Sequence, residues 1–377
     1  MEPKRVLVFR TPDDSHSAAV GYAIRRKGHI CEYIYTADLP SLLNISLQVD
    51  PTKCEINLNG PDVAIPISLN TSFDTIWLRR HPDPILPEDM HPGDRLVAER
   101  QCKSILRGLY PLLDPHRSTM WVNHFTVSND TAPKPVQLKL AASAGLQIPE
   151  TLISNDPTEI RRFIRKHHGI VAYKLLEAAT WMSADMKRAY KAYTATVSED
   201  GLPDDATLRL SPGVFQELLK KQFEVRVACL GTFLVAVRIN SQANNKAALD
   251  WRAGQFEIDM EAHVLPDDIA NKCRHFMHYM RLAHASLDFV VDVENNYVFL
   301  EANPQGQFLW MEQRTGLPLL DMFSEFLIGK SLTFDWKEDH EVIKLSSFDE
   351  TEWPLSYKRD SSNHIPCKRK GELLVID

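Results

Sequence analysis

The chain has 377 residues, of which 44% are hydrophobic and 25% are charged, and its formal net charge is -7. This composition excludes predominant disorder, because it provides enough apolar surface to offset the entropy of the chain. At about 100–200 residues per domain the length predicts two or three domains, and the negative charge argues against a general nucleic-acid binder, which usually has a basic surface.

No segment of the sequence predicts a membrane span. Its longest apolar runs, such as 6–9 and 170–173, are far shorter than the roughly 20 residues that a spanning helix needs. The N-terminus lacks the apolar core and the small-residue cleavage site of a signal peptide. None of the six cysteines forms a Cys-x-x-Cys pair, which favours reduced, mostly buried thiols over zinc or redox chemistry. We therefore expect a cytoplasmic protein that binds neither membrane nor nucleic acid.

The first unit, 1–120, predicts a small parallel sheet. An apolar strand at 6–9 is followed by a helix at 15–27, which Gly28 ends, and by a strand at 30–35. This β-α-β order is typical of parallel sheets. The other elements expected near or within this unit are strands within 47–67, a strand at 75–78 that leads into Arg79-Arg80-His81-Pro82, a helix at 94–113 and a closing strand at 121–123.

Two further units and a tail follow. For the second unit, 121–212, we expect helices at 136–144 and 157–168, strands at 149–153, 170–174 and 193–197, a mobile polar loop at 176–190 and a linker at 203–210. For the third unit, 213–330, we expect a meander over 214–218, 223–230 and 232–240, a helix at 266–282, a hairpin over 287–293 and 297–301, and a helix at 318–328. The tail, 331–377, is polar and weakly patterned, and its role stays open.

The sharpest chemical signal lies in the expected hairpin. Asp288 begins one strand, Glu301 ends its partner, and Asn303 follows two residues later. Because residues i and i+2 of an extended segment point the same way, Glu301 and Asn303 can share one face opposite Asp288. Three oxygen ligands of this kind suit Mg²⁺, which often bridges nucleotide phosphates. The alternative is a solvated hairpin with charged ends, and spacing alone does not decide between the two.

This pattern, an Asp followed after twelve residues by Glu-x-Asn, resembles the metal signature of the ATP-grasp ligases. Upstream, the sequence contains further features of that family in the expected order. They are Lys134 and Lys174 for the two ATP-phosphate lysines, Gln216, Glu217, Leu218 and Leu219 for the adenine hinge, Glu224 and Arg226 on the strand that contacts ribose and phosphate, and Arg238 for a phosphate- or substrate-binding arginine.

The resemblance narrows to the graspetide (microviridin-type) peptide macrocyclases and covers about residues 1–330. The residues that carry it surround Lys134, occupy 145–151 and 301–307, and include Asp250-Trp251-Arg252. It implies an α/β (α+β) protein with the ATP-grasp fold and an N-terminal pre-ATP-grasp βαβ domain. The second and third units would then be the central and C-terminal ATP-grasp subdomains.

The resemblance also implies an activity with ATP and Mg²⁺ as cofactors and a precursor peptide, with leader and core, as partner. An Asp or Glu side chain of the core would be phosphorylated, and a Ser or Thr hydroxyl or a Lys amine would then close an ester or amide ring. The loop at 176–190 would close over the site. The implied roles are Mg²⁺ binding by Asp288, Glu301 and Asn303, charge stabilisation by Lys134, Lys174, Arg226 and Arg238, and core contacts by Asp250 and Arg252.

Each of these residues also has a structural alternative. Lys134 could be solvated, Glu217, Glu224 and Arg226 could form a strand ion-pair ladder, and Trp251 could be a packing aromatic. At the level of activity, the alternatives are an ATP-grasp ligase for small molecules such as amino acids, a nucleotide-binding module without catalysis, and a ligase acting on a folded partner. The sequence identifies neither the precursor nor an oligomer interface, so a homodimer stays open.

Overall fold

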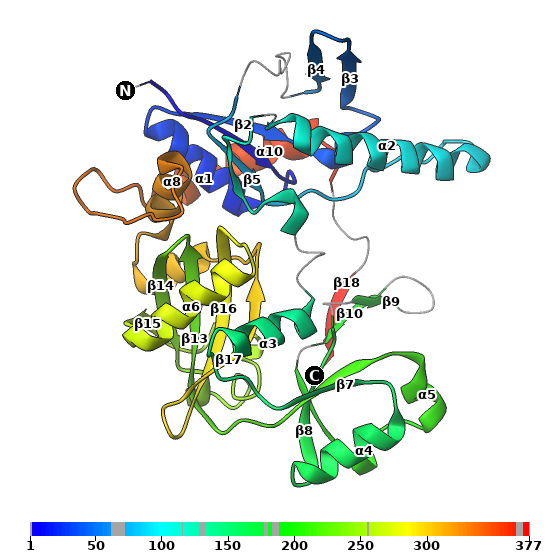
Figure 1. Ribbon diagram of the computed structural model, residues 1–377, viewed down its shortest axis with the longest axis vertical. Coiled ribbons are helices and arrows are strands. Elements are labelled where there is room, and N and C mark those ends of the chain that lie inside the picture. The colour runs from blue at the N-terminus through cyan, green and yellow to red at the C-terminus, as the bar shows by residue number, and fades with distance from the viewer. Residues whose placement is uncertain are drawn as a thin grey trace.

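A four-stranded parallel sheet, in the order β2-β1-β5-β6, forms the core of the N-terminal part of the computed structural model (Figure 1). Its strands are β1 (Arg5–Phe9), β2 (Ile30–Ile34), β5 (Thr75–Leu78) and β6 (Met120–Val122). Helix α1 (Ser15–Arg26) joins β1 to β2, and the Asp14 side chain caps its first turn. The parallel sheet expected from the β-α-β order is confirmed. The structure describes residues 2–61, 72–114, 116–127, 133–176, 180–182, 188–192, 194–254, 256–366 and 372–376.

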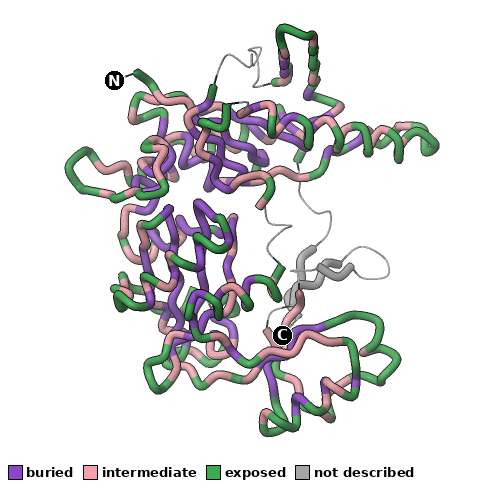
Figure 2. Tube along the Cα trace, in the orientation of Figure 1, coloured by how far each residue is buried: buried purple, intermediate pink, exposed green. Residues whose placement is uncertain are grey.

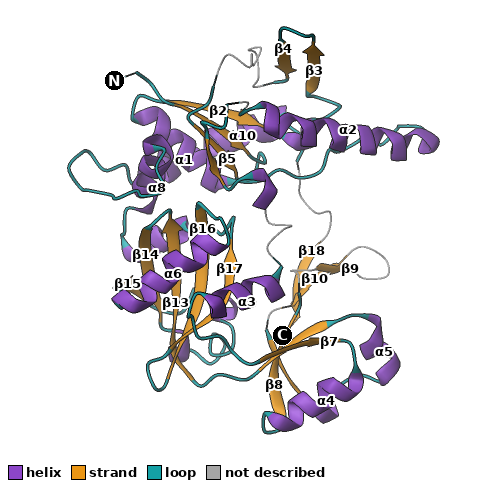
Figure 3. Ribbon diagram, in the orientation of Figure 1, coloured by secondary structure: helices purple, strands orange, loops and turns teal. Residues whose placement is uncertain are grey.

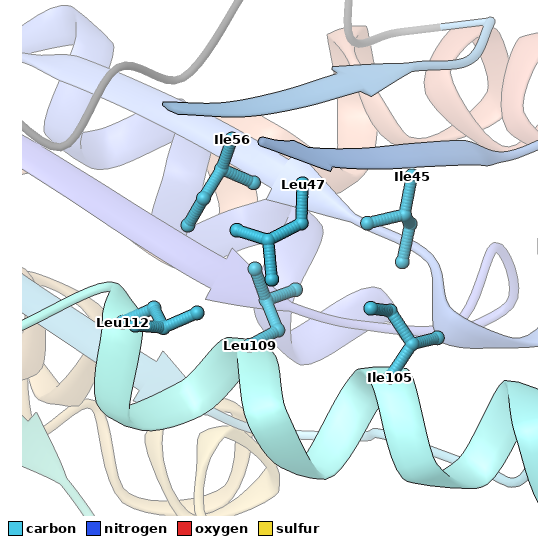
Figure 4. A pocket seen from close by; sticks show the side chains of 6 residues that line it. All are labelled: Ile45, Leu47, Ile56, Ile105, Leu109 and Leu112. Carbon is cyan, nitrogen blue, oxygen red and sulfur yellow. The ribbon is translucent and has the colours of Figure 1, made fainter. Parts of the chain in front are cut away.

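A hairpin and a long helix lie beside this sheet. The hairpin consists of β3 (Asn44–Val49) and β4 (Cys54–Asn59), and the helix is α2 (Pro92–Leu112), whose far end projects from the body in Figure 1. Six aliphatic side chains line a small apolar pocket between them (Figure 4): Ile45, Leu47, Ile56, Ile105, Leu109 and Leu112. The strands expected within 47–67 thus begin earlier in the chain, and positions 62–71 lie outside the described residues.

A second, antiparallel sheet has the order β11-β8-β12-β7. Its strands are β7 (Thr151–Ser154), β8 (Ile170–Lys174), β11 (Ala195–Ser198) and β12 (Gly213–Gln216). Helix α4 (Pro157–Lys166) covers it through Ile160, Phe163 and Ile164, and the short helix α5 (Asp205–Leu210) replaces the expected linker. The expected meander is wrong for its first strand, because β12 pairs with β7 and β8 and not with β13.

A third sheet of five antiparallel strands, in the order β15-β14-β13-β16-β17, forms the largest part of the fold. Its strands are β13 (Lys221–Leu230), β14 (Phe233–Ile239), β15 (Met260–His263), β16 (His284–Asp292) and β17 (Tyr297–Asn303). Helices α3 (Lys134–Ser143) and α6 (Asp267–Tyr279) lie across one face in Figure 3. The apolar residues of that face, such as Val225, Phe289 and Phe299, are buried beneath these helices.

The N-terminal sheet shares a core with this third sheet. Helices α7 (Leu309–Thr315) and α8 (Leu319–Gly329) lead from β17 towards α1, and the buried trace in Figure 2 continues through both parts. Phe323 of α8 packs on Trp77 of β5 with ring centroids 4.8 Å apart. The Thr75 hydroxyl donates a 2.7 Å hydrogen bond to the Leu327 carbonyl. The two parts are therefore joined by apolar packing as well as by the chain.

Regular structure also occurs in the two segments that we expected to be irregular. The stretch expected as a mobile loop contains β9 (Thr180–Met182) and β10 (Arg188–Ala192), and its positions 177–179 and 183–187 lie outside the described residues. The tail forms α9 (Leu345–Thr351), α10 (Trp353–Asn363) and β18 (Glu372–Ile376), which pairs with β10. No helix within the described ranges combines the length and apolarity that a membrane crossing requires.

The tail buries charged residues against the N-terminal sheet. Asp360 of α10 pairs with Arg10 at 3.1 Å, and the side chains of both residues are at most 1% exposed. Just beyond α10, His364 Nδ1 lies 2.6 Å from the Asp38 carboxylate, and its ring stacks on Tyr35 with centroids 3.6 Å apart. The weakly patterned tail is therefore an integral part of the N-terminal core.

Asp360→Ala should destabilise the protein strongly, because it leaves the Arg10 guanidinium buried without this carboxylate. Breaking a buried pair in this way typically costs about 3–5 kcal/mol of unfolding free energy. Urea unfolding followed by circular dichroism measures the change. Asp339→Ala is the matched control, since the Asp339 side chain is 76% exposed. A loss in Asp360→Ala no larger than that of the control would contradict the assignment.

Candidate active site

The side chains of Asp288, Glu301 and Asn303 meet on one face of the five-stranded sheet. Asp288 on β16 lies opposite Glu301 on β17. The Asn303 amide nitrogen lies 3.3 Å from Asp288 Oδ2 and 3.5 Å from Glu301 Oε1. The geometric expectation that these three groups converge is confirmed. The set fits Mg²⁺, because carboxylate oxygens are preferred ligands and the Asn amide can turn to present its oxygen.

Cationic side chains from three other segments surround these carboxylates. Arg226 of β13 donates to both oxygens of Asp288, at 2.7 and 2.6 Å. Lys134, at the first turn of α3, lies 3.2 Å from Glu301 Oε2 and also donates to the Leu175 carbonyl at 3.2 Å. Arg252 approaches the other Glu301 oxygen at 3.8 Å. Lys134 thereby connects the ends of β8 and β17, which belong to different sheets.

The electrostatics of the two carboxylates differ. Burial alone would raise the pKa of Glu301, but Lys134, Arg252 and Lys174 hold it well below its ordinary value. Burial, together with the charge of Glu301, raises the pKa of Asp288 even though Arg226 opposes this shift. Two neighbouring carboxylates of this kind repel each other, and a bound cation would relieve that repulsion.

Lys174, at the end of β8, lies within this charged group. Burial lowers the pKa of its ammonium to about 8, while the negative charge of Glu301 opposes the shift and Lys134 and Arg252 add to it. A lysine with such a pKa is charged at neutral pH, and the surrounding protein groups neutralise its positive charge only in part. A phosphate would therefore supply a favourable negative partner.

Asp250 orients Arg252 and contacts Thr194, the residue just before β11. One Asp250 oxygen accepts hydrogen bonds from the Arg252 main-chain N–H at 3.1 Å and from its Nε at 3.0 Å. The other oxygen accepts from the Thr194 main-chain N–H at 3.3 Å and from its hydroxyl at 3.2 Å. Trp251, which lies between Asp250 and Arg252 in the sequence, is buried and packs on Trp310. The geometry thus gives Asp250 a positioning contact with Arg252, and Thr194 is a residue that the sequence did not point to.

The expected adenine hinge is the connection between β12 and β13. Gln216 is buried and donates from Nε2 to the Thr151 hydroxyl at 3.0 Å. One carboxylate oxygen of Glu217 accepts from the Glu150 main-chain N–H at 2.9 Å, which fixes the start of the connection. Leu218 is exposed and Leu219 is half-buried. These contacts place the segment between the two sheets, and its role in base recognition stays a prediction.

Two expected site residues differ in their placement on the five-stranded sheet. Glu224 is buried on the same face as Arg226 and pairs with Lys221 at 2.8 Å. Arg238 lies opposite Val225 in the β13–β14 register, so it points to the face that carries α3 and α6. Its guanidinium stacks 4.0 Å from the centroid of the Phe223 ring and bonds to the Asn240 side chain. The structure therefore does not bring Arg238 to the carboxylates.

Sequence reasoning did not predict the contacts that hold the metal-signature segment in place, although Gln137 and Gln305 lie among the residues that carry the resemblance. Gln137 of α3 donates to the Ala302 carbonyl at 3.0 Å and accepts from the Ala302 N–H at 2.8 Å. Asn123 donates to the Pro304 carbonyl at 2.9 Å, and Gln305 donates to the Leu78 carbonyl at 2.8 Å. The one feature of the sequence that pointed to Asn123 was its position, as a polar residue directly after the strand that ends at Val122. For Gln137 the resemblance was the signal, but it assigned the residue no role, and a helical glutamine is ordinarily a surface residue.

Comparison with known proteins identifies the fold. No protein-family model and no curated protein matches the chain. Solved structures do match it. A RiPP-associated ATP-grasp ligase from Chryseobacterium gregarium, solved with ADP and with a leader and core peptide, is 25% identical; the match has a TM-score of 0.77 and covers 87% of this chain and 97% of that one.

Two macrocyclases from Microcystis aeruginosa MRC also match. MdnC, solved with the precursor peptide MdnA, is 25% identical with a TM-score of 0.73, and MdnB is 28% identical with a TM-score of 0.71. Each match covers 86% of this chain and 99% of the other chain. The fold and these matches thus define an ATP-grasp ligase. The resemblance to the graspetide macrocyclases expected from the sequence is confirmed.

The pKa of Lys174 can be measured directly. With lysines labelled as ¹³C-dimethyl derivatives, the Lys174 resonance should titrate with a midpoint near pH 8. Glu301→Gln should move that midpoint lower, because the carboxylate that favours the charged ammonium is gone. Loss of the resonance in Lys174→Arg assigns it. A midpoint that rises or stays constant in Glu301→Gln would show that the two groups do not interact.

Proposed function

We propose that this protein is an ATP-dependent ligase that closes macrocyclic esters or amides between side chains of a ribosomal precursor peptide. The observation that carries the proposal is the convergence of Asp288, Glu301 and Asn303 with Arg226, Lys134 and Lys174 on one sheet face. The bound leader and core peptide and ADP of the Chryseobacterium ligase support the substrate class and the nucleotide. ATP and Mg²⁺ are the cofactors of this reaction.

In the first step, an Asp or Glu carboxylate of the core peptide attacks the γ-phosphorus of ATP. A new O–P bond forms, the bond to the β-phosphate oxygen breaks, and ADP leaves an acyl phosphate behind. When Mg²⁺ is bound, Asp288, Glu301 and Asn303 would hold it, and it neutralises phosphate charge. Lys134, Lys174 and Arg226 supply further positive charge where the transition state spreads its negative charge.

In the second step, a Ser or Thr hydroxyl or a Lys amine attacks the acyl carbon. The new ester or amide bond forms, inorganic phosphate leaves, and the nucleophile loses a proton. Strands β9 and β10 lie between Lys174 and Thr194 in the chain. We infer that these strands help to exclude water, which would otherwise hydrolyse the acyl phosphate. Arg252, held by Asp250 and 47% exposed, is a cation that the core peptide can contact.

We also infer that the reaction takes place in the cytoplasm. Five cysteines within the described part of the chain are free thiols: Cys31, Cys54, Cys102, Cys229 and Cys273. Reduced thiols are typical of proteins that stay in a reducing compartment, where ATP is also plentiful.

Glu301→Gln should abolish ring closure while the fold is retained. The protein is co-expressed with a short peptide encoded beside its gene, and the intact mass of the peptide shows the loss of one water for each ring. We expect the variant to lower peptide-dependent ADP release by about 100-fold or more, because it removes a charge used in phosphoryl transfer.

Glu294→Gln is the matched control, because Glu294 is exposed at the turn of the same hairpin. Near-normal ADP release in Glu301→Gln would contradict the metal assignment. An unchanged peptide mass with the wild-type protein, together with ADP release on free amino acids, would instead favour a small-molecule ligase.

Arg226→Ala and Arg238→Ala should differ sharply, because the two side chains lie on opposite faces of the sheet. We expect Arg226→Ala to lower peptide-dependent ADP release by about 100-fold or more, as for other charge-stabilising groups. Arg238→Ala should lower it by less than about 3-fold, a small effect typical of a residue away from the site. Steady-state ADP assays with both variants measure this difference, and equal losses would show that Arg238 also acts on the nucleotide.

A further inference from the structure

The carboxyl edge of the N-terminal parallel sheet carries three arginines. In the order β2-β1-β5-β6, the chain leaves β1 towards one side and β5 towards the other, so the order reverses between these strands. In open parallel sheets, ligands bind in the crevice at that position. Arg10 follows β1 directly, and Arg79 and Arg80 follow β5. The main-chain N–H groups of Arg79 and Arg80 both bond to the Phe9 carbonyl, at 3.1 and 2.9 Å.

This edge adjoins the segment that follows the proposed metal ligands. Asn303 ends β17, and the next residues contact the N-terminal sheet through Pro304 and Gln305. The Arg79 guanidinium donates to the Gln305 carbonyl. His16 Nε2 accepts the main-chain N–H of Phe308 at 3.1 Å. The carboxyl edge of the N-terminal sheet and the segment that follows Asn303 are therefore in direct contact.

Two of the three arginines are neutralised within the protein. Arg10 pairs with Asp360 at 3.1 Å, and Arg79 pairs with Asp14 at 3.1 Å. Arg80 differs from both. Among the residues that the structure describes, no carboxylate lies within 4.0 Å of its guanidinium, and its one polar side-chain contact is a 3.4 Å bond to the Gln305 amide oxygen. Its side chain is only partly buried, so the guanidinium remains within reach of a ligand.

The surroundings of Arg80 compensate its positive charge only in part. Burial lowers the pKa of His16 to about 3, and Arg79 and Arg80 add to the shift, so this imidazole stays neutral. Burial and the charge of Arg79 also lower the pKa of Arg80, while Asp14 and Asp13 oppose the shift. An arginine in this position gains from an external anion, and the planar guanidinium matches a carboxylate with two parallel hydrogen bonds.

We propose that Arg80 binds an Asp or Glu side chain of the core peptide and thereby selects which carboxylate enters the site. The inference rests on the proposed function and extends it to the N-terminal sheet. A carboxylate held at Arg80 would lie beside Gln305, two residues after Asn303. Selection of a charged side chain at this point would exclude the corresponding Asn and Gln amides, which lack the negative charge.

A double-mutant cycle tests this role. Two fluorescently labelled precursor peptides serve as probes: one keeps a single core Asp or Glu, and the other carries only Asn and Gln in its core. Their dissociation constants are measured by anisotropy with wild-type protein and with Arg80→Ala. Wild type should bind the acidic peptide about 10- to 100-fold more tightly, as for hydrogen bonds to charged groups. Arg80→Ala should bind the two peptides equally. The interaction energy from this cycle, between the Arg80 substitution and the removal of the core carboxylate, then measures the contact between the two groups.

Matched variants separate this role from a structural one. Arg80→Lys keeps the charge without the planar fork and should retain part of the discrimination. Arg100→Ala changes an exposed arginine of α2 and should retain all of it. Discrimination that persists in Arg80→Ala would overturn the proposal. So would weaker binding of a non-hydrolysable ATP analogue with discrimination intact, because it would place Arg80 at the nucleotide.

The wild-type mass assay distinguishes this proposal from the proposed function. If wild-type protein removes water from the single-carboxylate peptide and Arg80→Ala discriminates as before, only the role of Arg80 fails. If wild-type protein leaves that peptide unchanged and also fails to discriminate between the two probes, both proposals fail. Circular dichroism melting of each variant shows whether a loss of binding reflects a loss of fold.

Discussion

The structure depends on holding the largely buried carboxylates of Asp288 and Glu301 side by side on adjacent strands. Such a pair is costly unless positive charge surrounds it. Each supporting cation comes from a different segment: Arg226 from the neighbouring strand, Lys134 from the start of a helix and Arg252 from a short 3-10 helix. The arrangement of sheets and helices can be understood as the means of bringing these groups together.

The two faces of the five-stranded sheet carry different side chains. The face covered by α3 and α6 is mostly apolar, although it also carries Arg238. The other face combines apolar packing, for example at Leu230 and Val237, with the charged side chains of Glu224, Arg226, Asp288 and Glu301. Because α3 begins with Lys134, it contributes apolar packing through its later turns and a charge at its first turn. A single helix thus serves both faces.

The sequence predicted local features well and the register of strands poorly. The β-α-β opening followed from apolar runs and Gly28, and the convergence at Asn303 followed from the two-residue period of a strand. The face of Arg238 depends on the pairing of Val225 with that residue, and a shift by one position would reverse it. The sheet membership of β12 and the burial of Asp360 depend on contacts between distant segments, for which no local pattern exists.

The tail has a consequence for how the protein is made. His364 and Asp38 are 326 positions apart in the chain, yet they are in direct contact. Arg10 likewise pairs with Asp360, which is synthesised about 350 residues later. When the N-terminal sheet leaves the ribosome, the charges of Arg10 and Asp38 therefore still lack these partners. Contacts over such separations slow folding, because a long loop must close before they form. The first sheet to be synthesised therefore reaches its full stability only after the tail has been made and has packed against it.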